Sequence, residues 1–337
     1  MSTKPTKPKE TPASRWLSFR PEIKVVDCTI RDGGLMNNHH FEDQIVKVVY
    51  NTCVAAGIDY MELGYKASRK GIKLGEHGCW KYCQEEDLRR IVGENKTDLK
   101  LCVMADAERC DYHEDIPPKK ESVVDMIRVA TYISQISTAL EMVKDAHDKG
   151  YETTLNLMAA STIPENELEE GLQMLATSEA KAIYVVDSFG ALYSEKVQHL
   201  VKKYLHYCKQ TGKEVGMHMH NNLQLAFANT IDGIVLGANY LDATMAGLGR
   251  GAGNCPMELL IGFLHNPKYN LRPVLDCVQN HIEPMRAKLL WGYDLPYLLT
   301  GMLNQHPRAA IKFKEAELKG SKGDIVEFYN GVISGEQ

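Results

Sequence analysis

The sequence lacks the features that define several large classes of protein. None of the apolar runs in its 337 residues approaches the ~20 residues needed to cross a membrane. The nine cysteines include no CxxC pair, so neither a zinc ribbon nor a regular disulfide framework is indicated. The formal net charge is -5, without the global excess of positive charge typical of nucleic-acid-binding domains. We therefore expect a cytoplasmic protein that binds neither membranes nor nucleic acid.

What the sequence has instead is a regular alternation of strand-like and helix-like segments. A polar stretch rich in Lys, Pro, Thr and Ser comes first, and we interpret residues 1–20 as a flexible tail. Eight strand-like runs follow, at residues 23–29, 60–64, 100–105, 126–130, 153–158, 182–187, 215–220 and 240–246. Segments with helical spacing lie between or after them, at residues 42–56, 85–94, 134–149, 165–177, 194–211, 223–236 and 257–264. Only the acidic connection at 107–121, with two adjacent prolines, is not expected to form a regular helix.

Eight strands with connections of helix length predict an α/β fold, the closed parallel (β/α)8 or TIM barrel. The repeat stops near residue 266, and residues 271–290 and 294–304 have the pattern of additional helices. We therefore predict a catalytic barrel at 21–266 and a small C-terminal helical region at 267–337. In such barrels the reactive side chains lie at the C-terminal ends of the strands.

Charged and imidazole side chains stand at two of these strand ends. The first strand runs into the sequence DCTIRDGG (residues 27–34), which supplies a fixed cation and a carboxylate above a backbone able to turn sharply. In the seventh strand, His218 and His220 are two residues apart and therefore face the same side. They form either half of a metal site or a pair of buried, hydrogen-bonded histidines. Strands 1 and 7 are separated only by strand 8 in a closed barrel, so Asp32 can join the two histidines, which favours the metal site.

A glycine-rich loop, GLGRGAGN (residues 247–254), follows the eighth strand. Its glycines allow the backbone to approach a ligand closely, and the amide oxygen of Asn254 could complete the coordination of a metal. A dinucleotide-binding role is not favoured, because no ribose-binding acid follows in a βαβ unit.

These motifs together resemble a known superfamily. DxTxRDG at 27–33, HxH at 218–220 and the glycine-rich loop resemble the metal-dependent lyase and aldolase barrels typified by 3-hydroxy-3-methylglutaryl-CoA lyase and the isopropylmalate synthases. VDSFGA at 186–191 and WGY at 291–293 make the chain most similar to the 4-hydroxy-2-oxovalerate aldolases. The resemblance covers residues 23 to about 300.

The resemblance implies an aldolase acting on a 2-keto acid. Asp32, His218, His220 and Asn254 would hold a divalent ion, Mn²⁺ or Mg²⁺ first and Zn²⁺ or Co²⁺ as alternatives, and the ion would polarise the keto group. Arg31 would stabilise the enolate oxygen, and Tyr293 matches a tyrosine that assists proton transfer. Enzymes of this type are expected to form homo-oligomers. Many also bind an acylating aldehyde dehydrogenase through their C-terminal helices, but the resemblance ends near residue 300 and does not extend to this partnership.

One position departs from the family pattern. The aldolases carry a histidine two residues after the glycine of RDG, as the base that takes the proton of the 4-hydroxyl, and this chain has Leu35 there. Substitute bases could be Tyr293, His77 or Glu62, each of which could equally have a structural role. His39 coincides with a family histidine that is not the base.

Two alternative functions stay open. A Claisen-type synthase joining an acyl-CoA to a 2-keto acid would share the metal site, although the synthases continue RDG with Glu-Gln rather than Gly-Leu. A catalytically reduced barrel acting as a binding protein would fit Leu35 but not the intact ligand set. A further open question is the loop 65–73, whose four cations either bind an anionic group of the substrate or simply face solvent.

Overall fold

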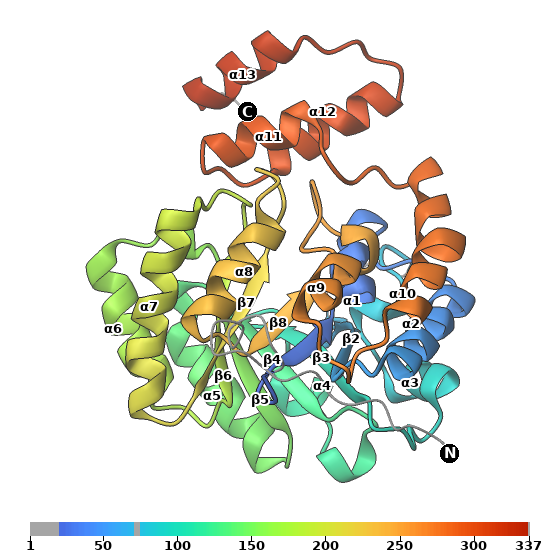
Figure 1. The fold of residues 1–337 in the computed structure, drawn as a ribbon, viewed down its shortest axis with the longest axis vertical. Coiled ribbons are helices and arrows are strands. Elements are labelled where there is room, and N and C mark those ends of the chain that lie inside the picture. Colours follow the sequence, from blue (N-terminus) through green and yellow to red (C-terminus); the bar gives the residue numbers. More distant parts are fainter. Residues whose placement is uncertain (1–19, 71–74, 336–337) are drawn as a thin grey trace, which may run out of the picture.

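The computed structural model describes residues 20–70 and 75–335, which form a closed barrel of eight parallel strands surrounded by helices (Figure 1). The strands pair in the order of the sequence, and β1 closes the barrel by pairing with β8. Their bounds are β1 Lys24–Asp27, β2 Tyr60–Tyr65, β3 Lys100–Asp106, β4 Met126–Thr131, β5 Glu152–Leu157, β6 Ala182–Asp187, β7 Glu214–Met219 and β8 Tyr240–Ala243. The predicted TIM barrel is confirmed.

The predicted helical connections of the barrel are confirmed, and further helices and helical turns are present. Their bounds are α1 Thr29–Gly33, α2 Asp43–Ala56, α3 Glu85–Val92, α4 Tyr112–Asp115, α5 Ile136–Asp148, α6 Glu165–Ala176, α7 Ser194–Gln210, α8 Ala226–Leu236, α9 Met257–Leu264, α10 Leu271–Cys277, α11 Leu295–Met302, α12 Arg308–Leu318 and α13 Ile325–Ser334. Short turns of helix stand at η2 Gly34–Met36, η3 Cys79–Lys81, η4 Lys119–Glu121, η5 Ile133–Gln135, η6 Ala160–Thr162, η7 Met245–Gly247, η8 Val278–Ile282 and η9 Glu283–Ala287. None of the helices in residues 20–70 and 75–335 is long and apolar enough to span a membrane.

The helix α2 shows why these segments fold as they do. Its buried side chains include Val46, Val49, Tyr50 and Cys53, which share one face at the i, i+3, i+4, i+7 spacing. The helix ends at Gly57, whose φ of 70° is left-handed and where a Cβ would lie 2.6 Å from the carbonyl oxygen of Lys268. The barrel strands, by contrast, are covered on both faces, so β2, β4 and β6 are buried throughout.

The interior of the barrel is layered. At its lower level lie the rings of Tyr60, Tyr184 and Tyr240, with centroids 6.1 and 6.4 Å apart along the series Tyr60–Tyr240–Tyr184. Two residues further along the strands, inward positions carry charge: Glu62 on β2 and Asp242 on β8. The aromatic layer therefore supports a charged layer, which lies directly below the C-terminal ends of the strands.

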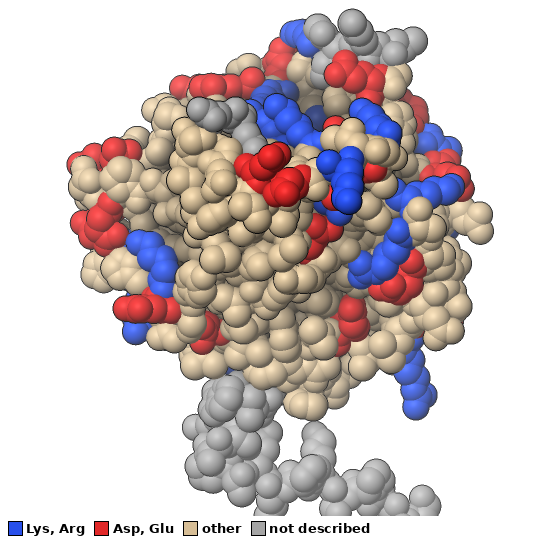
Figure 2. All heavy atoms as spheres, turned by 90° about the horizontal axis from the view of Figure 1, so that it is seen from above, with Lys and Arg blue, Asp and Glu red and all other residues tan. Residues whose placement is uncertain are grey.

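The C-terminal helices divide between two positions. Helix α10 packs against α2 and α9 on the side of the barrel, whereas α11, α12 and α13 lie beyond the ends of the strands (Figure 1). Tyr297, Ala310 and Phe328 are buried in a small core of their own there. Figure 2 looks down on this end and shows positive and negative side chains interspersed around a broad area without charge. The boundary near 267 stays a prediction.

Three details differ from the sequence-based expectation. The first strand ends at Asp27 and the last at Ala243, because residues 29–33 and 245–247 coil into helical turns. The segment 271–290 is not one helix but α10 followed by a π turn and a 3-10 turn up to residue 287. Helices α12 and α13 lie in the predicted C-terminal helical region but were not predicted individually: α12 is rich in charged residues, whereas α13 has an apolar sequence that was overlooked.

Candidate metal and enolate site

A helical turn after β1 presents the first ligand candidate. Asp27 ends the strand and accepts hydrogen bonds from the backbone nitrogen and the hydroxyl of Thr29, at 3.2 and 2.7 Å. The Thr29 hydroxyl oxygen in turn accepts from the backbone nitrogen of Met245, at 2.9 Å, which ties the turn to the loop after β8. Burial raises the pKa of Asp27 to about 7. This anchored turn, rather than the strand itself, carries Arg31 and Asp32 into the barrel mouth.

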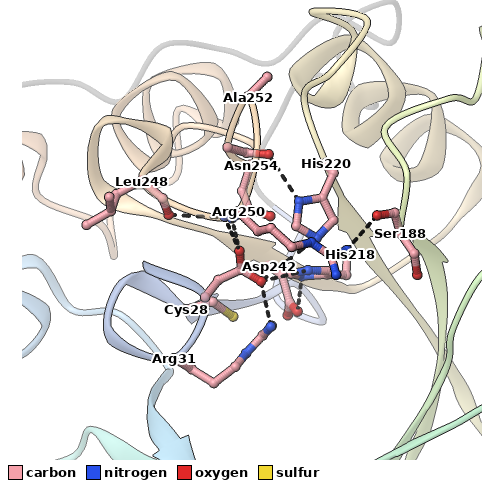
Figure 3. Close-up of polar contacts among 12 residues, drawn as sticks. Cys28, Arg31, Ser188, His218, His220, Asp242, Leu248, Arg250, Ala252 and Asn254 are labelled. Atoms are coloured by element: carbon pink, nitrogen blue, oxygen red, sulfur yellow. Dashed lines mark hydrogen bonds and ion pairs between the residues drawn. The ribbon is translucent and has the colours of Figure 1, made fainter. Parts of the chain in front are cut away.

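The two histidines of β7 meet Asp32 there. His218 and His220 project into the barrel with their rings 5.1 Å apart and nearly perpendicular (Figure 3). The Nε2 atoms lie 3.5 and 3.9 Å from the Asp32 Oδ2 atom. One ligand atom from each of the three residues lies within 4.8 Å of the others, and all three side chains are buried. The structure therefore brings Asp32, His218 and His220 together, as the order of the strands in a closed barrel predicted.

Both histidines are oriented by a partner on the opposite ring nitrogen. His218 Nδ1 lies 2.9 Å from Asp242 Oδ2, and His220 Nδ1 donates to the carbonyl oxygen of Gly253 at 3.2 Å. Each Nε2 is thereby left facing Asp32, which is the arrangement found around metal-ligating histidines. Burial lowers the pKa of His220 to about 3, so this imidazole is neutral and keeps a lone pair for a ligand bond.

The loop after β8 supplies the fourth candidate. Asn254 donates from Nδ2 to Asp32 Oδ1 at 2.9 Å, while its buried Oδ1 has no hydrogen-bond partner among the described residues. Gly249 makes this approach possible, since a Cβ there would lie 2.0 Å from Asn254 Nδ2 and 2.5 Å from Asp32 Oδ1. The glycines thus allow this loop to pack closely around the Asp32 carboxylate, as the sequence predicted.

These residues fit a divalent cation. They offer a carboxylate, two imidazoles and an unpartnered amide oxygen, a mixed oxygen and nitrogen set. Burial by itself raises the pKa of Asp32. The neighbouring Arg31 and His220 have the larger effect and hold that pKa well below its usual range. A second cluster of Cys28, His218 and Asp242 fits a metal less well, because burial raises the pKa of the Cys28 thiol far above its usual value.

A buried ionic network holds Arg31 beside this ligand set. Its Nε donates to Glu62 Oε2 and its NH1 to Asp32 Oδ2, both at 2.6 Å, while NH2 is buried without a partner among the described residues. Arg128 NH1 also approaches Glu62 Oε2, at 2.9 Å, and its NH2 donates to Asp242 at 2.6 Å. Glu62 therefore shares one oxygen between two guanidinium groups. This arrangement suits a group that orients Arg31 better than the substitute base suggested from the sequence.

Tyr293 lies apart from the other predicted residues. Its side chain is 63% exposed, on the segment before α11, and no hydrogen bond or ion pair among the described residues joins it to the ligand set. Its role in proton transfer stays a prediction. Leu35 and His77 line a cavity at the mouth of the barrel, together with His39.

The sequence did not lead us to predict a role for three charged residues of the site. Arg128 and Asp242 are charged residues at inward-facing positions of otherwise apolar strands. A charge in such a strand is the feature of the sequence that could have pointed to them. Arg250 donates its backbone nitrogen to Asp32 Oδ1 at 3.0 Å and its NH2 to the carbonyl oxygen of Ser188 at 2.7 Å. Nothing in the spacing of the glycine-rich loop indicates this bridge to β6.

Comparisons with known proteins agree with this geometry. The HMGL-like family model matches residues 22–282. The 4-hydroxy-2-oxovalerate aldolase of Carboxydothermus hydrogenoformans is 30% identical over 307 residues, which cover 87% of this chain and 88% of that protein. The enzyme of the same name from Thermus thermophilus is 29% identical over 265 residues, covering 77% and 75%.

Solved structures show the same architecture. The N-terminal domain of a proposed aldolase from Bacteroides vulgatus has a TM-score of 0.73 and 29% identity, with 86% of this chain and 96% of that chain covered. The hydroxymethylglutaryl-CoA lyase of Pseudomonas aeruginosa, at 16% identity, has a TM-score of 0.63 and covers 78% and 93%, so it shares the fold. The family match and the ligand set together support dependence on a divalent metal ion. The predicted family and class are confirmed: this chain belongs to the HMGL-like family and is an enzyme of the lyase class, an aldolase.

Proposed function

We propose that the chain cleaves a 4-hydroxy-2-oxo acid to pyruvate, or a close analogue of it, and an aldehyde. The observation that carries the proposal is the convergence of Asp32, His218, His220 and the free oxygen of Asn254 beside the unpartnered NH2 of Arg31. Relatives at up to 30% identity carry the name 4-hydroxy-2-oxovalerate aldolase, which supports this substrate class.

Asp32, His218, His220 and Asn254 would hold the metal. The ion would be Mn²⁺ or Mg²⁺, with Zn²⁺ and Co²⁺ as alternatives. The bound ion would supply electrophilic assistance at the keto group of the substrate. His218 is kept in position by Asp242, and Asp32 by Asn254 and the backbone of Arg250.

Arg31 stabilises the charge that develops as the bond breaks. Cleavage removes the proton of the 4-hydroxyl, breaks the C3–C4 bond and leaves its electron pair as an enolate, which becomes pyruvate when C3 is protonated. Since Glu62 and Asp32 already fix two of its nitrogens, Arg31 can direct NH2 at the enolate oxygen without reorganising. The proton acceptor is not Leu35, whose side chain is hydrocarbon; His77 on the same cavity and Tyr293 are the candidates.

Exchange of the methyl protons of pyruvate with deuterated solvent tests the proposal. We expect metal-depleted protein to be inactive and Mn²⁺ to restore exchange, whereas Asp32→Asn abolishes both exchange and Mn²⁺ binding, followed by electron paramagnetic resonance. Asp148→Asn, at an exposed Asp paired with Lys144, is the matched control and should leave both unchanged. Metal-independent exchange would contradict the proposal. Stimulation by acetyl-CoA would instead support the Claisen-type synthase.

Assembly as a homo-oligomer and a cytoplasmic location also stay proposals. No association with an aldehyde dehydrogenase is proposed.

A further inference from the structure

A cavity of about 830 Å³ lies beside the metal ligand set, between the loops that follow β1, β2 and β3. Gly34 and Leu35 form part of its wall and follow Asp32 by only two and three residues, so the cavity adjoins the turn that carries the carboxylate. A water molecule takes up about 30 Å³ of liquid, so this space is large enough for an aldehyde that carries an additional group. The polar side chains in its wall include His39, Lys70, His77, Lys81, Glu108 and Arg109.

Lys81 is a half-buried cation without a carboxylate partner. Its Nζ lies 4.2 Å from the centre of the Tyr65 ring, and no Asp or Glu oxygen in the described parts of the chain comes within 4.0 Å of it. Burial lowers the pKa of Lys81, and although Asp106 raises it, that carboxylate forms no ion pair with the ammonium. An ammonium group in this position is stabilised by an anion that enters the cavity.

Two imidazoles beside Lys81 are also incompletely bonded. His39 and His77 have rings 6.2 Å apart, and the Nδ1 of each is buried without a hydrogen-bond partner among the described residues. His39 is itself 3% exposed and packs on Tyr65 at 5.3 Å. Burial lowers its pKa to about 3, so it enters the cavity wall as a neutral ring that still has one N–H to donate.

Of the other cations near the cavity, Lys70 and Lys66 are already engaged, whereas the exposed Arg109 of the wall has no ion pair with the described residues. Lys70 pairs with Asp111 and Glu114, at 2.6 and 3.0 Å. Lys66 donates to the carbonyl oxygen of Cys83 and lies 3.8 Å from Glu85. Lys66 and Lys70 of the loop 65–73 are thus neutralised, and the half-buried cation without a carboxylate partner is Lys81 of η3. The exposed Glu108 is the acid of the wall that lacks a cation, and Gln135 donates to it.

We propose that this cavity binds the aldehyde half of the substrate, and that this half carries an anionic group, a carboxylate or a phosphate, held by Lys81 with His39. The inference rests on the proposed aldolase function and names its substrate class. In the direction of synthesis, a bond forms between C3 of pyruvate and the aldehyde carbon, C3 loses a proton and the aldehyde oxygen gains one. The anionic group takes no part in that step and serves binding alone.

Matched aldehydes test the proposal in the Mn²⁺-loaded enzyme with pyruvate. Succinic semialdehyde against butanal compares a carboxylate with a methyl end, and glyceraldehyde 3-phosphate against glyceraldehyde does the same for a phosphate. We expect kcat/KM to favour one anionic member over its neutral partner by about 10- to 100-fold, the range of a charge-assisted hydrogen bond. The pair of aldehydes that shows the preference identifies the anionic group as a carboxylate or a phosphate.

Lys81→Met should remove that preference, because it keeps the aliphatic stem and deletes the charge. Lys70→Met is the control, since Lys70 lines the same cavity but is already paired with two carboxylates, and it should keep the preference. Equal rates for charged and neutral aldehydes, or an unchanged preference in Lys81→Met, would overturn the inference. Exchange of the pyruvate methyl protons, measured without any aldehyde, separates this proposal from the proposed aldolase function. If the protein does not catalyse that exchange, the aldolase function itself is wrong.

Discussion

The two sides of the barrel mouth differ in how their charged groups are paired. On the side of β7 and β8, Asp32 has Arg31 and Asn254 as partners, and Asp242 has Arg128 and His218. On the side of β2 and β3, Lys81 has no carboxylate partner among residues 20–70 and 75–335. The charges of the first side are thus paired within the protein, whereas the second side keeps a cation that an anionic substrate could pair with. This division suits an enzyme that fixes its chemistry on one side and its specificity on the other.

The largest effect expected on the side of β7 and β8 is that of Arg31→Lys. Lysine keeps the positive charge but cannot bond Glu62, Asp32 and an enolate oxygen together through a planar fork. We expect the rate of pyruvate proton exchange to fall by about 10²- to 10³-fold, the usual cost of losing one preorganised donor. The measurement is exchange at saturating Mn²⁺. Affinity for Mn²⁺ should change far less, and a parallel loss of affinity would show that Arg31 acts through the metal site rather than on the substrate.

Asp242→Asn tests the support of His218 on the same side. The amide no longer fixes the proton on His218 Nδ1 as the carboxylate does, so the orientation of Nε2 loosens. We expect Mn²⁺ affinity to fall by about 10- to 100-fold, measured by titration and electron paramagnetic resonance. Asp125→Asn, at a partly buried Asp paired with Lys119 and far along the chain from the ligand set, is the comparison. An unchanged affinity in Asp242→Asn would mean that His218 is held by packing alone.

How much of this arrangement the sequence predicts depends on the distance between partners. The barrel follows from local alternation, and Asp32 meets His218 and His220 because strand order in a closed barrel is a simple rule. The pairing of Arg128 with Asp242 spans 114 residues and is visible only as two charges in apolar strands. Lys81 escaped notice because the loop 65–73 looked more basic, and only tertiary contacts show which cations are neutralised. A turn was expected after the first strand, but the strand was expected to reach residue 29 because β-branched Thr29 continues its pattern, whereas residues 29–33 coil into a helical turn.

Acid should destabilise both sides through their buried histidines. His39 and His220 have folded pKa values of about 3, against 6.5 for the free side chain. Between these two values the unfolded chain binds more protons than the folded one. The free energy of unfolding therefore falls as the pH is lowered through this range. Each histidine should cost about 2 kcal/mol between pH 7 and pH 5. Urea unfolding of metal-free protein at the two pH values measures this loss.

The same experiment separates the two sides. His39→Gln should reduce the loss by about 2 kcal/mol with or without Mn²⁺. Saturating Mn²⁺ should protect the protein near pH 7 and lose effect as the pH falls, because protons compete with the metal for His218. Although burial lowers the pKa of His218, Asp242 and Asp32 raise it above its usual value. A pH dependence that is identical in His39→Gln and the unsubstituted protein would show that His39 does not titrate on unfolding as its burial requires.

The smallest expected effect concerns Tyr293, which belongs to neither side as the structure stands. Its hydroxyl was predicted to assist proton transfer, yet its side chain is 63% exposed. A group so open to water contributes less than a buried acid or base, so Tyr293→Phe should lower the rate of aldehyde release by less than tenfold. Tyr193→Phe, at a tyrosine 58% exposed before α7, is the matched control. A loss of 10²-fold or more in Tyr293→Phe alone would mean that the segment before α11 moves over the mouth during the reaction and that a third region joins the two compared above.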